Sequence, residues 1–456
     1  MITQQQLQAR LDSTARKLNV PGAAIAVAKG DQVVTAVTGV TNVTTGAPVV
    51  PETLFAAGSV TKVFTATLVM TLVDEGLVDL DTPVREYLPD FAVGEDPRSA
   101  EVTTRMLLNH SSGLPGNFTY DLPKGPDNVA GFVELLREYE FNSPPGSYWS
   151  YSNAGLVTAG RVAEVVTGRT FDQALAERVL RPLELNATSD TDEMILGSTA
   201  VGHVVDAQGN IQRVPRFQLG TNAPSGSALA LDVGALVTFG RMHLANGRTE
   251  DRRRVLTPES VTAMQVPQLD LPWRIGYDAF GLGWAIRNLN GHTLLGHTGA
   301  SAGQHSTLDI IPDQQGVLAA LTNSTTGAAL FAELCAELLD ECFDARPDAP
   351  PAASDAAIEV DLDPYVGVYT ADDGRLVVTE DDGALRVQIE ADPLFGEMMK
   401  LILGETAFPP PPLRLTPYAA DGRFVSDVGI PIQFVTPVGS EGVDYAYAGR
   451  IYRRGA

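Results

Sequence analysis

The stretch Ala57-Gly58-Ser59-Val60-Thr61-Lys62-Val63-Phe64, continued from Thr65 to Val73, decides the fold of the chain. Its apolar run is interrupted only by threonines, so the pattern predicts a helix that is apolar nearly all round and buried in a domain core. Lys62 then lies at the first turn of a buried helix, on the same face as Ser59. Burial disfavours the charged ammonium and lowers the pKa of such a lysine, which can then accept the proton of a serine hydroxyl.

The same residues have a simpler explanation, in which Ser59 caps the helix and Lys62 extends its amine to the surface. The chain contains five lysines, and only Lys62 has a serine three residues before it. The Ser-x-x-Lys pattern is therefore unique in this chain, but the rest of the sequence has to supply partners before it can be interpreted as catalytic.

Composition indicates a soluble globular protein, because 44% of the 456 residues are hydrophobic and 19% are charged. A net charge of −24 argues against nucleic acid or an anionic membrane as a partner. The first six residues lack the basic and apolar regions of a signal peptide, and the sequence has no apolar stretch long enough to span a membrane, so we expect a cytoplasmic protein. Cys335 and Cys342 are expected to be buried thiols, and the sequence predicts neither a metal site nor a cofactor.

The order of apolar patterns predicts an α+β fold, in which helices lie between two groups of strands that join in one antiparallel sheet. We expect a helix at 3–18, strands at 23–28 and 32–40, helices at 129–140, 154–167, 171–180 and 231–245, strands at 281–287, 292–296, 304–311 and 317–321, and a helix at 328–343. Two irregular regions, at 113–128 and 186–224, are expected to shape a binding cleft.

Composition also divides the chain into domains. Residues 1–344 form the large α+β unit, and the proline-rich stretch 345–357 reads as a linker. Residues 358–456 contain short segments of alternating hydrophobicity, which predict a small all-β sandwich or barrel.

Two further motifs could act with Ser59. Tyr151-Ser152-Asn153 precedes a predicted helix; a tyrosine near a cation can have a lowered pKa and act as a base, and an asparagine amide can orient a substrate. His297-Thr298-Gly299-Ala300 lies where a predicted strand ends, and glycine there would let the backbone approach closely and offer an N–H to a developing oxyanion. Taken alone, each of the two motifs is better explained by a structural role.

Together, Ser-x-x-Lys at 59, Tyr-x-Asn at 151 and His-x-Gly at 297 resemble, in type and order, the motifs of the serine β-lactamase and penicillin-binding protein superfamily. The stretches Leu107 to Pro115 and Ala223 to Phe239 are also similar to family segments, so the resemblance covers roughly residues 5–343. It is closest to the class C type, which includes esterases and D-aminopeptidases. The trailing β domain is similar to the lipocalin-like domains attached to some D-aminopeptidases.

The resemblance implies a role for each matching residue. Ser59 would be the acylated nucleophile, and its N–H with that of Ala300, after Gly299, would form the oxyanion hole. Lys62 and Tyr151 would share proton transfer. Asn153 would hold the substrate, and His297 would stand where β-lactamases carry a lysine. A histidine at this position favours esters and D-amino-acid peptides over β-lactams as substrates.

These residues predict a cofactor-free serine hydrolase that forms an acyl-enzyme at Ser59 and cleaves a small-molecule ester, amide or D-amino-acid peptide. One alternative is an acyltransferase (transacylase) of secondary metabolism, in which an amine or alcohol takes the acyl group instead of water. Another is a non-catalytic module that binds peptidoglycan fragments or β-lactams. The sequence leaves open whether the protein forms a homo-oligomer.

A second serine has to be weighed, because Gly299-Ala300-Ser301-Ala302-Gly303 fits the Gly-x-Ser-x-Gly elbow of α/β-hydrolases. That elbow requires a helix after the serine and a catalytic histidine late in the chain. Here a strand is predicted at 304–311, and His305 is the last histidine. We therefore expect Ser301 to be a loop residue near the cleft.

Overall fold

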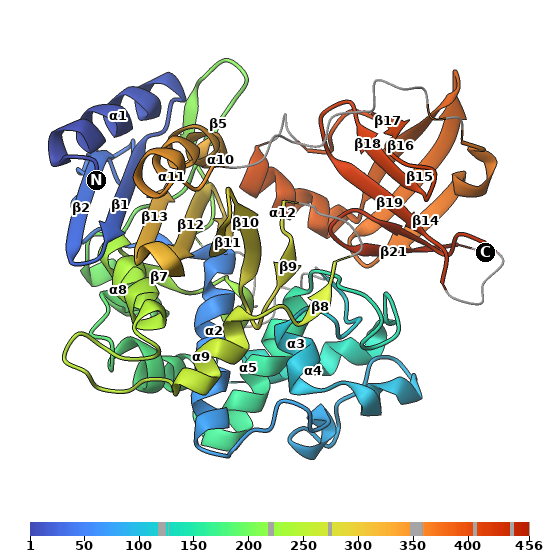
Figure 1. Ribbon diagram of the computed structural model, residues 1–456, viewed down its shortest axis with the longest axis horizontal. Coiled ribbons are helices and arrows are strands. Elements are labelled where there is room, and N and C mark those ends of the chain that lie inside the picture. Colours follow the sequence, from blue (N-terminus) through green and yellow to red (C-terminus); the bar gives the residue numbers. More distant parts are fainter. Residues whose placement is uncertain are drawn as a thin grey trace.

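The computed structural model describes residues 1–116, 125, 127–217, 223–271, 276–346, 358, 360–404, 408–437 and 442–455. A large N-terminal unit of sheet and helices lies beside a smaller C-terminal β-barrel (Figure 1). This arrangement confirms the predicted α+β fold with a small β domain. Most of the predicted linker lies outside the described residues, so the domain boundaries stay a prediction.

An eight-stranded antiparallel sheet forms the centre of the N-terminal unit, in the order β2-β1-β13-β12-β11-β10-β9-β8. Its strands are β1 (Gly22–Lys29), β2 (Gln32–Gly39), β8 (Leu269–Asp270), β9 (Ala279–Phe280), β10 (Ala285–Leu289), β11 (His292–Ser301), β12 (Gln304–Ile311) and β13 (Gly316–Thr322). Strand β1 pairs with β13, and Ala23 lies opposite Thr322. The N-terminal hairpin and the later strands therefore join in one sheet, as predicted.

Helices cover both faces of this sheet, because the central strands carry apolar side chains on each of the two faces. Ile25 and Leu318 pack against α1 (Gln4–Lys17) and against the helix formed by α10 (Gly327–Leu330), a π-helical turn η8 (Phe331–Cys335) and α11 (Ala336–Phe343). Ala24 and Leu308 face α2 (Thr61–Asp74) and α8 (Val233–Leu244).

Helix α2 is the most deeply buried helix of the N-terminal unit among those described. Twelve of its fourteen residues are buried, which confirms the prediction from its apolar sequence. Two of its threonines bond to carbonyl oxygens: the hydroxyl of Thr65 donates to that of Pro224 at 2.6 Å, and the hydroxyl of Thr71 to that of Leu68 at 2.7 Å. Phe64 stacks on Phe239 of α8 at a centroid distance of 3.8 Å.

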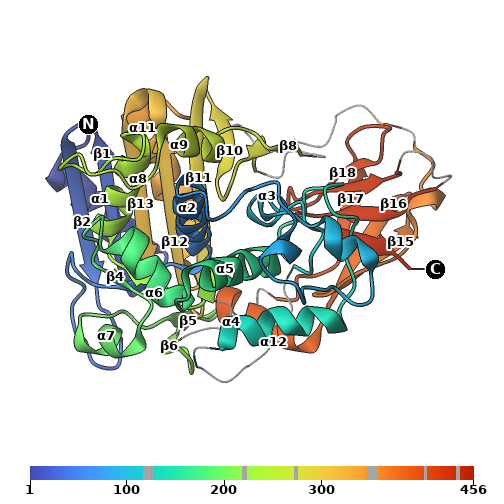
Figure 2. The same ribbon diagram turned by 90° about the horizontal axis from the view of Figure 1, so that it is seen from below.

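Most of the remaining helices form a region on the α2 side of the sheet, in the lower half of Figure 1 and in the view from below in Figure 2. The remaining elements are α3 (Thr104–Leu108), α4 (Asn128–Glu134), α5 (Asn153–Thr167), α6 (Phe171–Leu175) with the π-helical turn η5 (Ala176–Leu180), α7 (Thr191–Leu196), α9 (Pro258–Gln265), and short strands β3 (Phe55–Ala56), β4 (Ala187–Thr188), β5 (His203–Val205), β6 (Ile211–Arg213) and β7 (Ala230–Leu231). Strand β5 lies instead in the upper half of Figure 1, beside α10. The predicted irregular region 186–224 thus contains short elements, and residues 218–222 lie outside the described residues.

Two strands differ from their predicted bounds by more than one residue. The strand expected from residue 281 begins at Ala285, because Gly283 has a φ of +80° and the chain turns there. The strand expected to end at Gly296 continues to Ser301, because its last residues stay paired with β12, where Ser301 faces Gln304. The His297 motif therefore lies inside strand β11 and not after its end.

The C-terminal unit is a closed antiparallel barrel whose strands follow one another in chain order. They are β14 (Gly367–Ala371), β15 (Gly374–Asp381), β16 (Ala384–Ala391), β17 (Leu413–Pro417), β18 (Arg423–Ser426), β19 (Pro431–Val435), β20 (Tyr445–Tyr447) and β21 (Ile451–Arg454). One helix, α12 (Pro393–Leu403), was not predicted; it begins where the side chain of Asp392 accepts backbone N–H groups. It contacts the N-terminal unit, since Gly303 N donates to Leu401 O at 2.8 Å.

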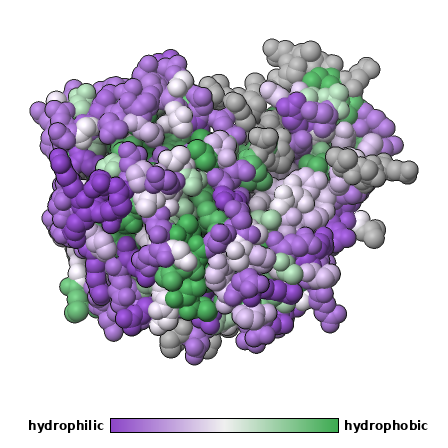
Figure 3. All heavy atoms as spheres, turned by 60° about the horizontal axis from the view of Figure 1, so that its bottom comes forward, coloured by the Kyte–Doolittle hydropathy of each residue, from purple (hydrophilic) through white to green (hydrophobic). Residues whose placement is uncertain are grey.

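The face of the molecule in Figure 3 carries many hydrophilic residues. Figure 3 shows hydrophilic residues on both sides of a hydrophobic stripe that runs down the middle of the face in view. Among the described residues there is no helix with the length and apolar character needed to cross a membrane. The two cysteines are free and buried, as predicted.

Candidate active site

Ser59 and Lys62 lie where a 3₁₀ turn, η1 (Gly58–Val60), leads into α2. Lys62 is fully buried, and its Nζ lies 2.9 Å from Ser59 Oγ and 2.6 Å from the carbonyl oxygen of Ser225. Burial, and secondarily the positive charge of Arg450, hold the pKa of Lys62 well below its ordinary value. A neutral amine can donate one N–H to the Ser225 carbonyl and turn its lone pair to the Ser59 hydroxyl, so the surface-lysine alternative is wrong.

Two glycines let strand β11 approach Ser59 closely. Gly58 has a φ of +51°, and a Cβ at this position would lie 2.6 Å from Ala300 N. A Cβ at Gly299 would lie 2.2 Å from the carbonyl oxygen of Ala57 and 2.9 Å from Ser59 N. Only glycine fits at both positions without displacing backbone. The main chains of Ser59 and Ala300 therefore lie side by side, as an oxyanion hole made from their N–H groups requires.

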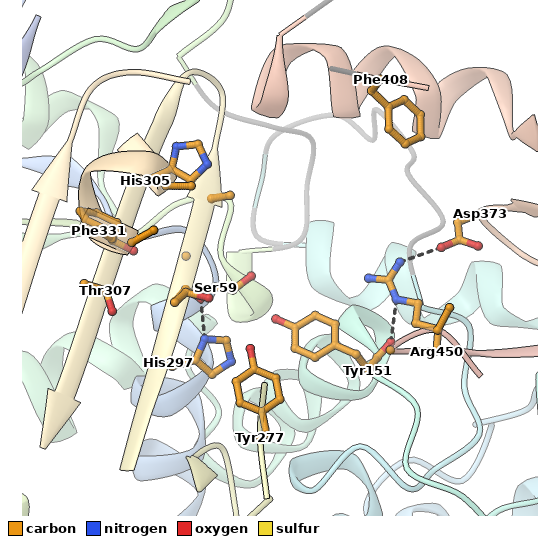
Figure 4. A pocket seen from close by; sticks show the side chains of 18 of the residues that line it. Ser59, Tyr151, Tyr277, His297, His305, Thr307, Phe331, Asp373, Phe408 and Arg450 are labelled. Carbon is orange, nitrogen blue, oxygen red and sulfur yellow. Dashed lines mark hydrogen bonds and ion pairs between the residues drawn. The ribbon is translucent and has the colours of Figure 1, made fainter. Parts of the chain in front are cut away.

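Tyr151 and Asn153 lie at the entrance to α5, whose first residue is Asn153. The hydroxyl of Ser152 caps this helix by accepting from Gly155 N at 3.0 Å, which fixes the residues on either side of it. Lys62 Nζ lies 4.9 Å from the centroid of the Tyr151 ring, and the hydroxyl of Tyr151 points toward Ser59 (Figure 4). All three predicted motifs therefore meet at one place.

The expected lowering of the Tyr151 pKa is wrong. Burial raises the pKa of the phenol, and a hydrogen bond with Ser59 only partly opposes this effect. The positive charge of Arg450 also lowers this pKa, but burial raises it by more. Tyr151 is consequently a protonated phenol at neutral pH, suited to donate a proton rather than to act as a phenolate base.

His297 also lies in this cluster, with its ring 6.2 Å from that of Tyr151. Its Nδ1 lies 2.6 Å from the carbonyl oxygen of Thr298, which can only accept, so we assign the proton to Nδ1 and a lone pair to Nε2. Burial, followed by the charge of Lys62, lowers the pKa of His297 to about 3. The group that stands where β-lactamases carry a cation is therefore neutral.

His110 packs against the ring of Tyr151. In the sequence analysis it appears only as part of the family segment Leu107 to Pro115. It is fully buried, its ring lies 4.5 Å from that of Tyr151, and its Nδ1 accepts from Ser152 N at 3.1 Å. Burial, then the charge of Lys62, holds its pKa well below the ordinary value. The signal for this residue was its place in the Leu107 to Pro115 segment.

The barrel contributes a charged pair that the sequence analysis missed. Arg450, in the turn between β20 and β21, donates from Nε to the carbonyl of Tyr151 at 3.1 Å and from Nη1 to Asp373 Oδ2 at 2.7 Å (Figure 4). Its guanidinium also lies 5.6 Å from the centre of the Tyr151 ring. Nothing in the sequence separates this arginine from its neighbours in the β domain.

One cavity of about 890 Å³ joins these groups. Ser59, Tyr151 and His297 line one part of it, and the apolar side chains of Phe331 and Leu339 line another. The facing wall belongs to the barrel and includes Asp373, Arg450, Ile389 and Phe395. The barrel therefore reaches into the cleft and is part of the site. Of the cleft loop expected at 113–128, residues 117–124 and 126 lie outside the described residues.

Ser301 does not form a nucleophile elbow. It is the last residue of β11 and is followed by a turn and strand β12, where the elbow needs a helix. Its hydroxyl is buried and has no partner among the described residues. The expectation that Ser301 is a loop residue is wrong, because it is still paired with Gln304 of β12 at the end of the strand.

A comparison with protein-family models matches most of the N-terminal unit to one family. The family model described as Beta-lactamase matches residues 5–339. The chain belongs to the Beta-lactamase family. The resemblance inferred from the three motifs is thereby confirmed, and family membership places the chain among serine hydrolases. No group of His, Cys, Asp and Glu side chains that could hold a metal ion occurs within the described ranges.

Relatives in this family extend the comparison. Penicillin-binding protein 4 of Amycolatopsis lactamdurans is 36% identical over 71% of this chain and 86% of its own length. The unguisins hydrolase ungD' of Aspergillus campestris is 26% identical over 68% of this chain and 60% of its own length. The crystal structure of SurE is similar over 99% of both chains, with a TM-score of 0.82 and 29% identity. That similarity includes the C-terminal barrel, which lies beyond the family model.

Proposed function

We propose that this protein is a serine hydrolase that forms an acyl-enzyme at Ser59 and cleaves a small ester, amide or D-amino-acid peptide. The observation that carries the proposal is the fully buried Lys62 amine 2.9 Å from Ser59 Oγ. Because this lysine is buried, it cannot serve as a solvated surface charge. Its lowered pKa suits it to take a proton at neutral pH.

In the proposed reaction, Lys62 takes the proton of the Ser59 hydroxyl while the oxygen attacks the substrate carbonyl. The N–H groups of Ser59 and Ala300 stabilise the negative oxygen of the tetrahedral intermediate. Tyr151 donates its phenolic proton to the leaving amine or alcohol and is reprotonated by the Lys62 ammonium. The bond to the leaving group then breaks, and the acyl group stays on Ser59. Water completes the cycle, with Tyr151 and Lys62 acting in the reverse sense.

Asn153, His297 and Gly299 have supporting roles in this proposal. Asn153 begins α5 beside Tyr151, where its amide can hold a substrate carbonyl. Gly299 lets β11 lie against Ser59. Neutral His297 offers a lone pair rather than a positive charge, so a substrate carboxylate gains no ion pair there. We therefore place esters and amides before β-lactams as substrates.

The preference for a D-residue is supported by a relative. SurE has also been solved with D-Leu, in a structure that is 28% identical to this chain, covers 99% of both chains and has a TM-score of 0.80. The name of the unguisins hydrolase supports hydrolysis as the outcome. We take both as guides to the first substrates to test.

A second candidate is acyl transfer to an amine or alcohol, as in a transacylase of secondary metabolism. The observation in its favour is the size of the cavity. At about 890 Å³, the cavity is near the upper end of the usual 300–1,000 Å³ range for ligand pockets and could hold an acyl group together with an acceptor. The third hypothesis, a module that only binds its ligand, does not explain why a buried lysine contacts Ser59, because binding alone requires no proton acceptor there. A homo-oligomer stays a prediction.

The test is intact-mass measurement after exposure to p-nitrophenyl acetate and, separately, to a fluorescent penicillin. We expect the wild type to release nitrophenol and gain the mass of the acyl group. We expect Ser59→Ala to do neither, and its turnover to fall by a factor on the order of 10⁶. Ser301→Ala is the matched control and should keep full activity. Turnover by Ser59→Ala and its loss in Ser301→Ala would disprove the proposal. Adding an amine then distinguishes hydrolysis from transfer by the product formed.

A further inference from the structure

The turn between β14 and β15 carries two neighbouring carboxylates that make different contacts. Asp373 pairs with Arg450, whereas Asp372 reaches into the N-terminal unit. Oδ1 of Asp372 accepts from Gly116 N and from Asn142 Nδ2, both at 2.8 Å. Gly116 and Asn142 are buried and Asp372 is half-buried, so this carboxylate is the acceptor for two polar groups that are shielded from water.

Gly116 lies directly beside the Tyr-x-Asn motif. Its carbonyl oxygen accepts from the backbone N–H of Asn153 at 2.9 Å. The carbonyl of Pro115, in the same peptide group as the Gly116 N–H, accepts from the hydroxyl of Ser152 at 2.8 Å. That hydroxyl accepts in turn from Gly155 N and caps α5. A continuous chain of hydrogen bonds therefore runs from the barrel carboxylate to the first turn of the helix that begins with Asn153.

The bonds of this chain reinforce one another. A carboxylate that accepts from the N–H of a peptide group polarises the group, so that its carbonyl becomes a stronger acceptor. Asp372, bound to Gly116 N, thus strengthens the bond between the Pro115 carbonyl and Ser152. Loss of the carboxylate would leave the Gly116 N–H buried without this acceptor, and the segment that holds Asn153 in place would shift.

The barrel holds the two ends of the Tyr-x-Asn motif in different ways. Arg450 donates to the carbonyl of Tyr151 itself, whereas Asp372 acts on Asn153 through residues 115–116. The two contacts meet at Gly116, where a Cβ would lie 2.9 Å from Arg450 Nε. The contact through Asp372 therefore bears on the residue that holds the substrate, and not on the group that exchanges a proton.

We propose that Asp372 is a positioning residue, which fixes Asn153 and thereby governs how well the site holds its substrate. The inference rests on the proposed acyl-enzyme at Ser59 and on the substrate-holding role proposed for Asn153. Arg450 then serves proton transfer through Tyr151, and Asp372 serves substrate binding through Asn153. The barrel contributes to both steps from two adjacent turns.

The test compares two esters that release the same leaving group. N-acetyl-D-alanine p-nitrophenyl ester carries a second carbonyl that the Asn153 amide can hold, and p-nitrophenyl acetate does not. We expect Asp372→Ala to lower the ratio of their kcat/KM values about fivefold, within the range for loss of one hydrogen bond. Asp372→Asn keeps an oxygen that can accept from both donors and should retain most of the ratio. In an Asn153→Ala background, Asp372→Ala should change the ratio by less than about twofold, because two residues that act through one contact are not additive.

Two further variants control for loss of interface contacts and of charge. Asn142→Ala removes the second donor to Asp372 but leaves the link to Gly116, so the ratio should stay within about twofold of the wild type. Asp427→Ala removes an exposed carboxylate in the turn between β18 and β19 and should leave the ratio in the same range.

Several outcomes would overturn the inference. An unchanged ratio in Asp372→Ala would do so, as would an equal fall with and without the Asn153 amide. An equal fall in Asn142→Ala would show that docking of the barrel, and not the link through Gly116, sets the ratio. If Asp372→Ala does not fold, Asp372→Ser, whose side chain is shorter, is held to the same criteria. If p-nitrophenyl acetate acylates Ser59 in the wild type, the proposed function stands whatever Asp372 does; if it does not, both proposals fail.

Discussion

The N-terminal unit and the C-terminal barrel each form one wall of the cavity, and the two walls contribute different kinds of groups to the surroundings of Ser59. The N-terminal wall supplies groups that can exchange a proton, namely Lys62 at 2.9 Å and the phenol of Tyr151. The barrel wall supplies Arg450, which stays charged at every pH of interest and exchanges no proton. Arg450 instead holds the carbonyl of Tyr151 at 3.1 Å and adds to the lowering of the Lys62 pKa.

This difference indicates that chemistry and its electrostatic setting come from separate domains. Lys62 and Ser59 are held together by one turn of one helix, so they stay in contact without the barrel. Asp373 and Arg450 belong to the barrel and reach Tyr151 only when the two units are in contact. If this division is correct, variants in the N-terminal wall should abolish the reaction, whereas variants in the barrel wall should weaken it and move its pH dependence.

The largest effect in this comparison is expected for Lys62→Met. Removal of the proton acceptor should lower the rate of Ser59 acylation by about 10²–10⁴-fold, the range for loss of general acid–base catalysis. Stopped-flow release of nitrophenol measures this rate. A loss below tenfold would show that another group takes the proton.

Lys62→Met should also change the dependence of stability on pH. Because burial lowers the pKa of Lys62 in the folded chain, the unfolded chain binds one more proton between the folded pKa and the ordinary value of about 10.4. In that window the free energy of unfolding of the wild type rises with pH. The methionine variant lacks this slope and should be the more stable protein at pH 7, by about 1.4 kcal/mol for each unit of this window that lies above pH 7. Urea unfolding at pH 7 and 9.5 measures the difference, which should shrink at the higher pH.

An intermediate effect is expected for Arg450→Met combined with Asp373→Asn, which avoids leaving a buried carboxylate unpaired. Tyr151 loses the contact to its carbonyl, and a small displacement of a catalytic group can cost about 100-fold in rate. Loss of the nearby positive charge also raises the pKa of Lys62, so less neutral amine is present at a given pH. We expect acylation to fall by about 10–100-fold, and the acidic limb of the kcat/KM profile to move to higher pH.

Arg375→Met is the matched control for the barrel wall. Arg375 also lines the cavity and pairs with Glu390, but both side chains are about half exposed, and the pair makes no contact with Tyr151. Its loss should change the rate by less than threefold and leave the pH profile in place, since exposed ion pairs contribute little. A shift of the profile in Arg375→Met as large as that in the Arg450 variant would disprove a specific role for Arg450.

Much of the N-terminal wall could be predicted from the sequence because its signals are local. The apolar run after Lys62 predicts a buried helix, and spacing alone brings Ser59 and Lys62 to one face. Strand β11 was predicted too short, because Gly296 reads as a strand end although it and the residues after it remain paired with β12. The pKa of Tyr151 was predicted in the wrong direction, since the depth of burial of its hydroxyl depends on residues far away in the chain.

The barrel wall could not be predicted for the same reason. A short alternating pattern predicts β-strands, but it does not indicate which turn of a barrel will face another domain. Arg450 follows a glycine in one such turn, and its partner Asp373 lies in another turn of the barrel. Helix α12 was missed although its apolar pattern and its Asp-Pro start are visible, because the surrounding strand signals dominated that region.

The smallest expected effect concerns the change from a neutral to a charged group at His297. In the wild type a substrate carboxylate meets a neutral imidazole whose pKa burial lowers to about 3. His297→Lys would place a cation there, and a charge-assisted contact to the carboxylate of a penicillin should raise its acylation rate severalfold relative to that of p-nitrophenyl acetate. His297→Gln, which is neutral, should leave this ratio unchanged. Because position 297 is buried and lies near Lys62, the pKa of the new ammonium should be lowered as that of His297 is, and the gain should increase as the pH falls from 8 to 6. An equal ratio in both variants would show that the charge at this position of β11 does not select the substrate.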